Sequence, residues 1–192
     1  MGKSLAVCVF CSSSDTVPAV YRDTALSLAE EMAARHMTLI YGGGNNGLMG
    51  VLSERLHVRG GKVIGVITRN LKEMGYAYGD ANEMIVTEDI RQRKAVMEQY
   101  ADGFICLAGG FGTLEETLEI IALRQLGLLS RPIALMNTNQ FFGLLLGQFE
   151  KMCSEQFFGP EYTRLFSVTE SPAAALDYIV ANQDGGEERF LE

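Results

Sequence analysis

The sequence predicts one α/β domain of three layers, in which helices cover both faces of a doubly wound parallel sheet. Three observations predict it. Short, continuously apolar segments alternate with segments of helical periodicity along most of the chain. Two glycine-rich loops each follow an apolar segment and precede a helical one. The 192 residues fit a single domain, and a 47% share of hydrophobic residues is enough for its core.

The first expected strand covers residues 5–10 (LAVCVF), a continuous apolar run typical of a strand buried on both faces. Apolar positions at helical spacing predict a helix over residues 17–35. Residues 37–41 form the second strand and residues 48–58 the helix after it. The glycine pair at residues 60–61 ends that helix.

The middle of the chain repeats this alternation around a less regular segment. Residues 62–68 (KVIGVIT) predict the third strand. Residues 69–83 are polar and contain glycine, and we interpret them as a mobile flap. A short strand over residues 84–86 and a charged helix over residues 88–100 follow. Residues 103–107 (GFICL) predict another buried strand.

The last part of the chain predicts two strands among three helices. These elements are a helix over residues 113–127, a strand over 132–136, a helix over 140–153, a strand over 166–168 and a helix over 172–181. Regular alternation of strand and helix implies parallel strands joined by crossover helices. We therefore expect a Rossmann-like domain over residues 1–182 and a polar tail over residues 183–192.

The charge of the chain argues against a nucleic-acid polymer as partner. Its formal net charge is -8, which repels a polyphosphate backbone but leaves room for one local anion site. No apolar run is long enough to span a bilayer, and the apolar segment near the N-terminus is too short for a secretory signal. We expect a cytoplasmic protein whose four cysteines are reduced.

The first glycine loop, Gly42-x-Gly44-x-x-Gly47, formally matches a dinucleotide-binding fingerprint. It follows the second strand rather than the first, and the next strand ends without a carboxylate to hold a ribose, which argues against NAD(P). The loop is not a P-loop either, because Leu48 stands where lysine is required. A tight turn explains the glycines, but close approach of the backbone to a nucleotide is the use we favour.

The second glycine loop, Gly109-Gly110-Phe111-Gly112-Thr113, ends one buried strand and opens a helix. Free backbone N–H groups at a helix N-terminus form a site for phosphate. No lysine lies within the loop, so amides, the Thr113 hydroxyl and the helix dipole would hold the anion. Such a site suits a terminal phosphate on a small molecule.

Glu116 has two interpretations. Thr113-Leu114-Glu115-Glu116 fits a capping box, in which Glu116 only reaches back to the helix N-cap. Two adjacent carboxylates, with Glu119 one turn later, exceed what a cap needs, so one of them is expected to face the cleft beyond the strand ends.

The basic run 91–94 (RQRK) lies early in the helix before the second glycine loop. On an acidic protein it is either a solvated face or a group that meets the same cleft. Arginine binds phosphate and diol oxygens with a fixed fork of donors. The residues alone therefore indicate a phosphorylated small molecule with an acid and an arginine beside it.

Taken together, the motifs resemble the Lonely Guy (LOG) family of cytokinin riboside 5′-monophosphate phosphoribohydrolases, often mislabelled as lysine decarboxylases. The matching pieces are Cys8-Val9-Phe10-Cys11-x-Ser13-Ser14, Tyr41-Gly42-Gly43-Gly44-x-x-Gly47-Leu48-Met49-Gly50, Gly65-Val66-Ile67, Arg93-Lys94, Gly109-Gly110-x-Gly112-Thr113-x-x-Glu116 and Gln125-Leu126-Gly127. Ala108 and Ile90 depart from the family pattern, which has proline and methionine there.

The resemblance implies hydrolysis of the N-glycosidic bond of a purine nucleoside 5′-monophosphate, either AMP or an N6-modified AMP. Arg93 and Glu116 would be the catalytic pair. The substrate-binding residues it implies are Ser13, Gly43, Gly44, Gly47, Met49, Lys94, Gly109, Gly110, Gly112 and Thr113. It also implies no cofactor, no metal and a homodimer or larger homo-oligomer.

Two rival functions remain open from the sequence. A lysine decarboxylase needs pyridoxal phosphate and a Schiff-base lysine, and only Lys94 is expected near the cleft. A non-enzymatic carrier of a nucleotide or molybdenum cofactor would share the fold and the loops. The pairing of Arg93 with Glu116 favours a hydrolase, because a carrier needs no carboxylate beside a bound anion.

Overall fold

The computed structural model describes residues 4–183, and its centre is a parallel sheet of seven strands in the order β4-β3-β2-β1-β5-β6-β7. Every pair of neighbouring strands is parallel. The strands are β1 (Ala6–Phe10), β2 (Thr38–Tyr41), β3 (Lys62–Thr68), β4 (Glu83–Thr87), β5 (Gly103–Cys106), β6 (Ile133–Met136) and β7 (Ser167–Thr169). The predicted fold class is confirmed.

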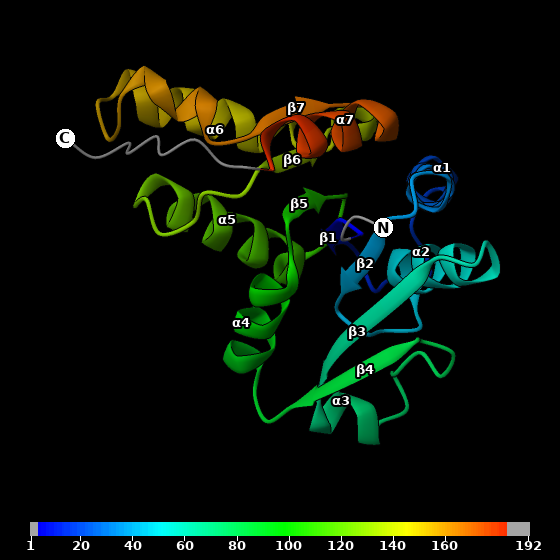
Figure 1. Cartoon of the computed structure of the whole chain (residues 1–192). Helices are drawn as coiled ribbons and strands as arrows, with labels where there is room; N and C mark the ends of the chain where they lie inside the picture. The colour runs from blue at the N-terminus through cyan, green and yellow to red at the C-terminus, as the bar shows by residue number, and fades with distance from the viewer. Residues whose placement is uncertain (1–3, 184–192) are drawn as a thin grey trace.

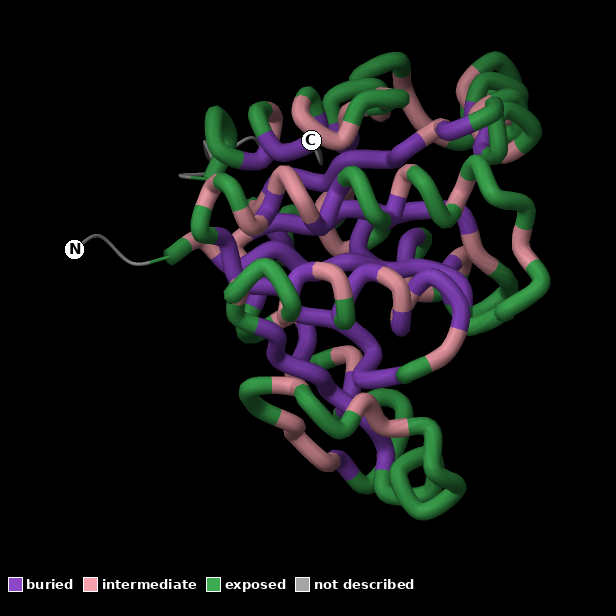
Figure 2. Tube along the Cα trace, turned by 90° about the vertical axis from the view of Figure 1, so that its right-hand side faces the viewer, coloured by how far each residue is buried: buried purple, intermediate pink, exposed green. Residues whose placement is uncertain are grey.

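Helices cover both faces of this sheet and complete the three layers (Figure 1). They are α1 (Ala19–Ala34), α2 (Gly47–Val58), α3 (Arg69–Glu73), α4 (Ile90–Tyr100), α5 (Phe111–Gln125), α6 (Gly143–Ser154) and α7 (Pro172–Asn182). Apolar side chains of α1, α2 and α7 pack on one face, and those of α4, α5 and α6 on the other. Figure 2 shows the buried strands between more exposed helices. No helix within residues 4–183 is both long and apolar enough to cross a bilayer.

Strand β1 shows why a continuous apolar run forms the middle of the sheet. Val7 and Val9 pack into the core on the α1 side, whereas Ala6, Cys8 and Phe10 pack into the core on the α4 side. Side chains alternate between the two faces of a strand, so a strand covered on both sides needs apolar residues at every position. Burying each large side chain contributes roughly 1.5–3 kcal/mol.

The order in which strands are added to the sheet reverses at β1, and this reversal determines where the candidate site lies. The chain builds outward from β1 through β2 and β3 to β4, then returns through α4 to add β5 on the other side of β1. The loops after β1 and β5 therefore run to opposite faces of the sheet and leave a crevice at the carboxyl ends of the strands. Both glycine-rich loops end strands at this edge.

The segment at residues 69–83, expected to be a polar flap, contains helix α3 and is attached to the first glycine loop. The Asn45 N–H donates to the carbonyl of Tyr76 at 2.9 Å, and the Tyr78 N–H donates to the carbonyl of Gly43 at 3.0 Å. Between them, Gly44 and Ala77 form an antiparallel bridge. These bonds join residues far apart in the sequence, so no periodic pattern predicts them. The interpretation of residues 69–83 as a mobile flap stays a prediction.

Several helices begin two or three residues from the predicted start, and at two of them the reason is local. Helix α5 begins at Phe111, two residues before the expected start, because Gly110 takes the N-cap position. Helix α6 begins at Gly143, three residues after the expected start, since Asn139 and Gln140 adopt positive φ angles. The predicted tail at residues 183–192 lies, apart from its first residue, outside the described residues, so the domain boundary stays a prediction.

Candidate active site

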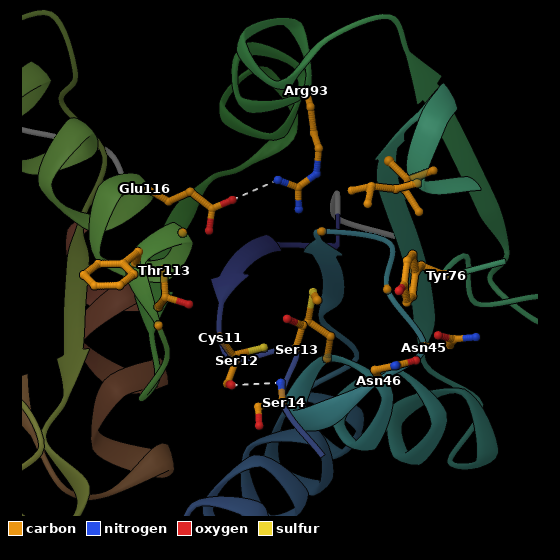
Figure 3. Close-up of a pocket in the computed structure, with 18 residues that line it drawn as sticks. Cys11, Ser12, Ser13, Ser14, Asn45, Asn46, Tyr76, Arg93, Thr113 and Glu116 are labelled. Carbon is orange, nitrogen blue, oxygen red and sulfur yellow. Dashed lines mark hydrogen bonds and ion pairs between the residues drawn. The ribbon is translucent and has the colours of Figure 1, made fainter. Parts of the chain in front are cut away.

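A cavity of about 610 Å³ opens at the carboxyl ends of the central strands (Figure 3). Small-molecule pockets typically measure roughly 300–1,000 Å³. Its wall is formed by the loops after β1, β2 and β5, together with side chains from α2, α3, α4 and α5. The lining residues are Cys11, Ser12, Ser13, Ser14, Gly42, Gly44, Asn45, Asn46, Met49, Ile67, Leu71, Tyr76, Arg93, Gly110, Phe111, Gly112, Thr113 and Glu116.

Arg93 and Glu116 form an ion pair in the cavity wall, with 2.9 Å between Nη1 and Oε1. The Arg93 side chain is 9% exposed and that of Glu116 12%. Arg93 comes from the first turn of α4, and its Nε donates to the carbonyl of Val66 in β3 at 2.8 Å. This second bond fixes the guanidinium plane, so the charge is held in one orientation. Figure 3 shows both side chains directed toward the cavity.

The protonation of Glu116 is set by two opposing effects. Burial disfavours the charged form and raises the pKa of Glu116, and the adjacent Arg93 opposes that rise. Burial is the larger effect, so the pKa lies above the ordinary glutamate value. A carboxylate with a raised pKa is a better proton acceptor near neutral pH than an exposed one.

Gly42, at the end of β2, makes room for the guanidinium. A Cβ placed there would lie only 2.0 Å from Arg93 Nη2. Any side chain at this position would displace the arginine from its bond with Glu116. Gly42 was absent from the predicted site, although it opens the glycine run that suggested one.

The N-terminus of α5 presents unpaired backbone donors to the cavity. Gly110 is the N-cap and provides no side-chain cap. Within residues 4–183, no acceptor meets the N–H groups of Phe111, Gly112 and Thr113. A Cβ at Gly110 or Gly112 would touch nothing within 4 Å, so open space lies in front of this turn. Such an arrangement suits an anion.

The capping-box interpretation of Glu116 is wrong. Thr113 is the third residue of α5 rather than its N-cap, and its side chain packs against the backbone of Gly109. Glu116 therefore lies one turn inside the helix and bonds to Arg93 instead of a cap amide. The sequence spacing was ambiguous because glycine can serve as an N-cap without a side chain.

The N-terminus of α2, after the first glycine loop, is already occupied by the chain itself. Gly47 N–H donates to Asp15 Oδ1 at 2.7 Å. The N–H groups of Leu48 and Met49 both donate to the carbonyl of Ser12, at 2.9 and 3.3 Å. The first turn of α2 is thus bonded to the loop after β1 and has these donors in use.

Eight of the twelve predicted site residues line the cavity, namely Ser13, Gly44, Met49, Arg93, Gly110, Gly112, Thr113 and Glu116. Four do not. Gly43 has a φ of +72° and packs against Ile67, and Gly109 lies behind Thr113. Gly47 has a φ of +59° and packs on the loop after β1. Lys94 forms ion pairs with Glu115 and, at 2.9 Å, with Glu119.

Several lining residues were missed by the sequence reasoning. Ser12 and Ser14 follow β1 at the edge where ligands bind, a position that already favours a site. Leu71 and Tyr76 belong to the segment interpreted as a flap. Cys11 belongs to the family motif but was not among the predicted site residues, and burial raises the pKa of its thiol, which stays protonated. Asn45, Asn46, Ile67 and Phe111 complete the missed set.

No group of three or more His, Cys, Asp or Glu side chains in the described part of the chain is arranged to hold a metal ion. The cysteines Cys8, Cys11, Cys106 and Cys153 are free thiols. The first three are buried, as expected for Cys8 in a core strand. Among the ionisable side chains that line the cavity, Arg93 and Glu116 are the two that pair with each other.

Comparison of the structure with known ones shows the fold. The molybdenum cofactor binding protein from Rippkaea orientalis superposes with a TM-score of 0.70 at 20% identity, covering 93% of this chain and 97% of that one. The molybdenum cofactor carrier protein from Chlamydomonas reinhardtii gives a TM-score of 0.70 at 18% identity, covering 93% and 99%. At this identity the likeness extends to the fold alone.

Comparison of the sequence shows the family. Residues 49–179 match the family model described as possible lysine decarboxylase. Over 163 residues the chain is 44% identical to cytokinin riboside 5′-monophosphate phosphoribohydrolase LOG5 of Arabidopsis thaliana, covering 83% of this chain and 70% of that protein. It is also 39% identical to the probable cytokinin riboside 5′-monophosphate phosphoribohydrolase LOGL2 of Oryza sativa subsp. japonica, and the match covers 90% of this chain and 71% of that protein. The resemblance found in the motifs is confirmed, and the chain belongs to the Lonely Guy (LOG) family of cytokinin riboside 5′-monophosphate phosphoribohydrolases.

Proposed function

We propose that this chain hydrolyses the N-glycosidic bond of a purine nucleoside 5′-monophosphate of the AMP or N6-modified AMP type, releasing the free base and ribose 5-phosphate. One observation carries the proposal: the buried Arg93–Glu116 pair lies in the same cavity wall as the open N-terminus of α5. An acid fixed beside an anion site is what cleavage of a phosphorylated nucleoside requires.

The 5′-phosphate belongs at the first turn of α5. The unpaired N–H groups of Phe111, Gly112 and Thr113 and the positive end of the helix dipole supply donors and charge. No lysine lines the cavity within residues 4–183, so the phosphate is held by backbone rather than by a flexible cation. Because Glu116 lies about one helical turn further along α5, the ribose of a phosphate bound there reaches its carboxylate.

Breaking the glycosidic bond develops positive charge at C1′ of the ribose. The Glu116 carboxylate stabilises this charge and accepts a proton from the attacking water. The water oxygen bonds to C1′, the bond from C1′ to the purine nitrogen breaks, and its electron pair leaves with the base. The proton passes from Glu116 to the departing base, so the carboxylate is restored. Arg93 orients Glu116 through the bond from its Nη1, and its guanidinium supplies donors for the ribose hydroxyls.

The family description as a possible lysine decarboxylase finds no support in the cavity. Decarboxylation through pyridoxal phosphate needs a lysine amine to form the Schiff base. Lys94, the one candidate from the sequence, is paired with Glu115 and Glu119 and does not line the cavity. These interactions favour the protonated amine, which is not a nucleophile.

The test uses the purified protein with AMP, with N6-isopentenyl AMP and with the unphosphorylated isopentenyladenosine. Chromatography of the products is expected to show free base and ribose 5-phosphate from the nucleotides. No base is expected from the riboside, because it has no phosphate to bind at the first turn of α5. The ratio of the two nucleotide rates gives the preferred base. Binding of the nucleotides without release of base would contradict the proposal and favour a carrier.

We also propose that the chain acts as a cytoplasmic homodimer or larger homo-oligomer that uses a surface of α5. Phe111, Leu118 and Leu126 are exposed apolar residues at spacings that bring them to one side of this helix, and Phe111 is 93% exposed. Light scattering is expected to give at least twice the 21.0 kDa chain mass. A monomer at micromolar concentration would contradict it, and Leu118→Asp is expected to lower the mass of the assembly.

A further inference from the structure

The cavity has two chemically different sides. One side carries Glu116, Thr113 and the unpaired amides of α5, with the exposed ring of Phe111 beside them. Figure 3 shows Tyr76 on the wall across the cavity from Thr113 and Glu116. Met49, Ile67 and Leu71 also line the cavity and contribute apolar surface. A ligand that fits this cavity has an anionic end and a flat or apolar end.

The backbone of Tyr76 is fixed by hydrogen bonds, whereas its ring is partly exposed. Its carbonyl accepts from the Asn45 N–H at 2.9 Å, and its N–H donates to the carbonyl of Leu71 at 3.1 Å. The Gly44–Ala77 bridge adjoins it. The residue nevertheless stays 40% exposed, and its ring has no aromatic partner within residues 4–183. Backbone hydrogen bonds therefore hold Tyr76 at the cavity wall, where its ring is exposed to the cavity.

Tyr78, two residues later, provides a contrast on the same segment. Its ring contacts His57 edge-on at a centroid distance of 6.4 Å, and it packs against the core on the α2 side. It does not line the cavity. The two tyrosines therefore differ in their surroundings: Tyr76 faces the cavity, and Tyr78 packs on the core, whereas backbone hydrogen bonds hold the segment in place.

We infer that Tyr76 is a specificity-determining residue whose ring stacks on the purine of the substrate. The inference rests on the proposed function, since it needs a phosphate at α5 and C1′ beside Glu116. From C1′ the base extends away from the phosphate, toward the wall that carries Tyr76. Every base has a face on which an aromatic ring can stack, and purines offer the larger one.

The experiment compares Tyr76→Ala, Tyr76→Phe and the matched control Tyr78→Ala, with AMP as substrate. Loss of one stacked ring typically weakens binding by roughly 5- to 150-fold, and the exposed position of Tyr76 favours the low end. We expect Tyr76→Ala to raise KM by about 5- to 20-fold with kcat changed less than about twofold. Tyr76→Phe keeps the ring and is expected to restore most of the affinity, whereas Tyr78→Ala leaves KM unchanged and lowers Tm.

Tyrosine fluorescence gives a binding readout that does not need turnover. The chain has seven tyrosines and no tryptophan, so their emission is not masked. AMP is expected to quench the emission of the wild type and of Tyr78→Ala, and much less that of Tyr76→Ala. An unchanged KM and unchanged quenching in Tyr76→Ala, with the wild type active, would overturn the inference and leave the proposed function intact. A wild type that is quenched by AMP but releases no base would overturn the proposed function while the stacking site stands.

Discussion

The two glycine-rich loops look alike in the sequence and do different work in the structure. Both end a buried strand and open a helix at the same edge of the sheet. After the first loop, the N–H groups of Gly47, Leu48 and Met49 are bonded to Asp15 and Ser12. After the second loop, the N–H groups of Phe111, Gly112 and Thr113 remain without acceptors in the described chain.

The difference teaches that a glycine run at a helix N-terminus is an anion site only where its amides are left unbonded. The first loop uses its glycines for close packing, with Gly42 beside Arg93 and Gly47 against the backbone of Ser13. The second loop uses Gly110 and Gly112 to keep open space in front of the helix. One loop therefore positions the Arg93–Glu116 pair and the wall with Tyr76, and the other leaves its amides open for the phosphate of the proposed substrate.

Among substitutions in the two glycine-rich loops, the largest expected effect comes from Gly42→Ala, which adds a Cβ 2.0 Å from Arg93 Nη2. The guanidinium, at the end of a flexible side chain, would swing aside and leave Glu116. We expect kcat to fall by about 100-fold, since small misplacements of catalytic groups cost that much, with a modest change in Tm. Steady-state kinetics and a thermal melt measure both. Unchanged kcat would show that the first loop does not position the catalytic pair.

The pH profile sharpens the role of Arg93 in this arrangement. In the proposed mechanism the carboxylate is the active form of Glu116, and burial raises its pKa, so kcat/KM is expected to fall as the pH drops through a value above the ordinary glutamate pKa. Arg93→Gln removes the charge that opposes the rise and moves this acid limb to higher pH. Comparing both proteins with the same substrate cancels titration of the phosphate. An acid limb of kcat/KM at the same pH in the wild type and in Arg93→Gln would contradict the electrostatic coupling of Arg93 to Glu116.

A reciprocal pair of substitutions tests the comparison of the loops directly. Gly47→Ala forces a left-handed φ on alanine and places its Cβ 2.5 Å from the Ser13 carbonyl carbon. We expect a loss of about 2–4 kcal/mol in the free energy of unfolding. Gly112→Ala meets no atom within 4 Å and is expected to keep that stability but to raise KM for AMP about 10-fold, because its methyl group intrudes on the phosphate. The reverse pattern in melts and kinetics would exchange the roles of the loops.

The smallest expected effect is that of Asp15→Ala. It removes the carboxylate that accepts from the Gly47 N–H at 2.7 Å. Loss of such a helix-terminal acceptor costs about 0.5–2 kcal/mol, which lowers Tm by a few degrees in a chain of this size. Differential scanning calorimetry measures it. A gain in affinity for inorganic phosphate at the freed amide, absent in the wild type, would show that the first loop retains a latent anion site.

Most of the fold followed from the sequence because it depends on patterns within single elements. Continuous apolar runs predicted the buried strands, and only short or irregular pieces, such as α3, escaped. Arg93 and Glu116 came from the family resemblance, and the structure supplied the ion pair between them. The use of the α2 amides and the place of Lys94 depend on contacts between distant segments, which spacing along the chain does not encode.

The most direct test of the account compares Glu116→Gln with Glu119→Gln. Both residues are glutamates on α5, one turn apart, and Glu119 pairs with Lys94 outside the cavity. With AMP as substrate and released base as the readout, Glu116→Gln is expected to lose at least about 1,000-fold in kcat while still binding the nucleotide, and Glu119→Gln to match the wild type. A folded Glu116→Gln protein that releases base at the wild-type rate would contradict the account.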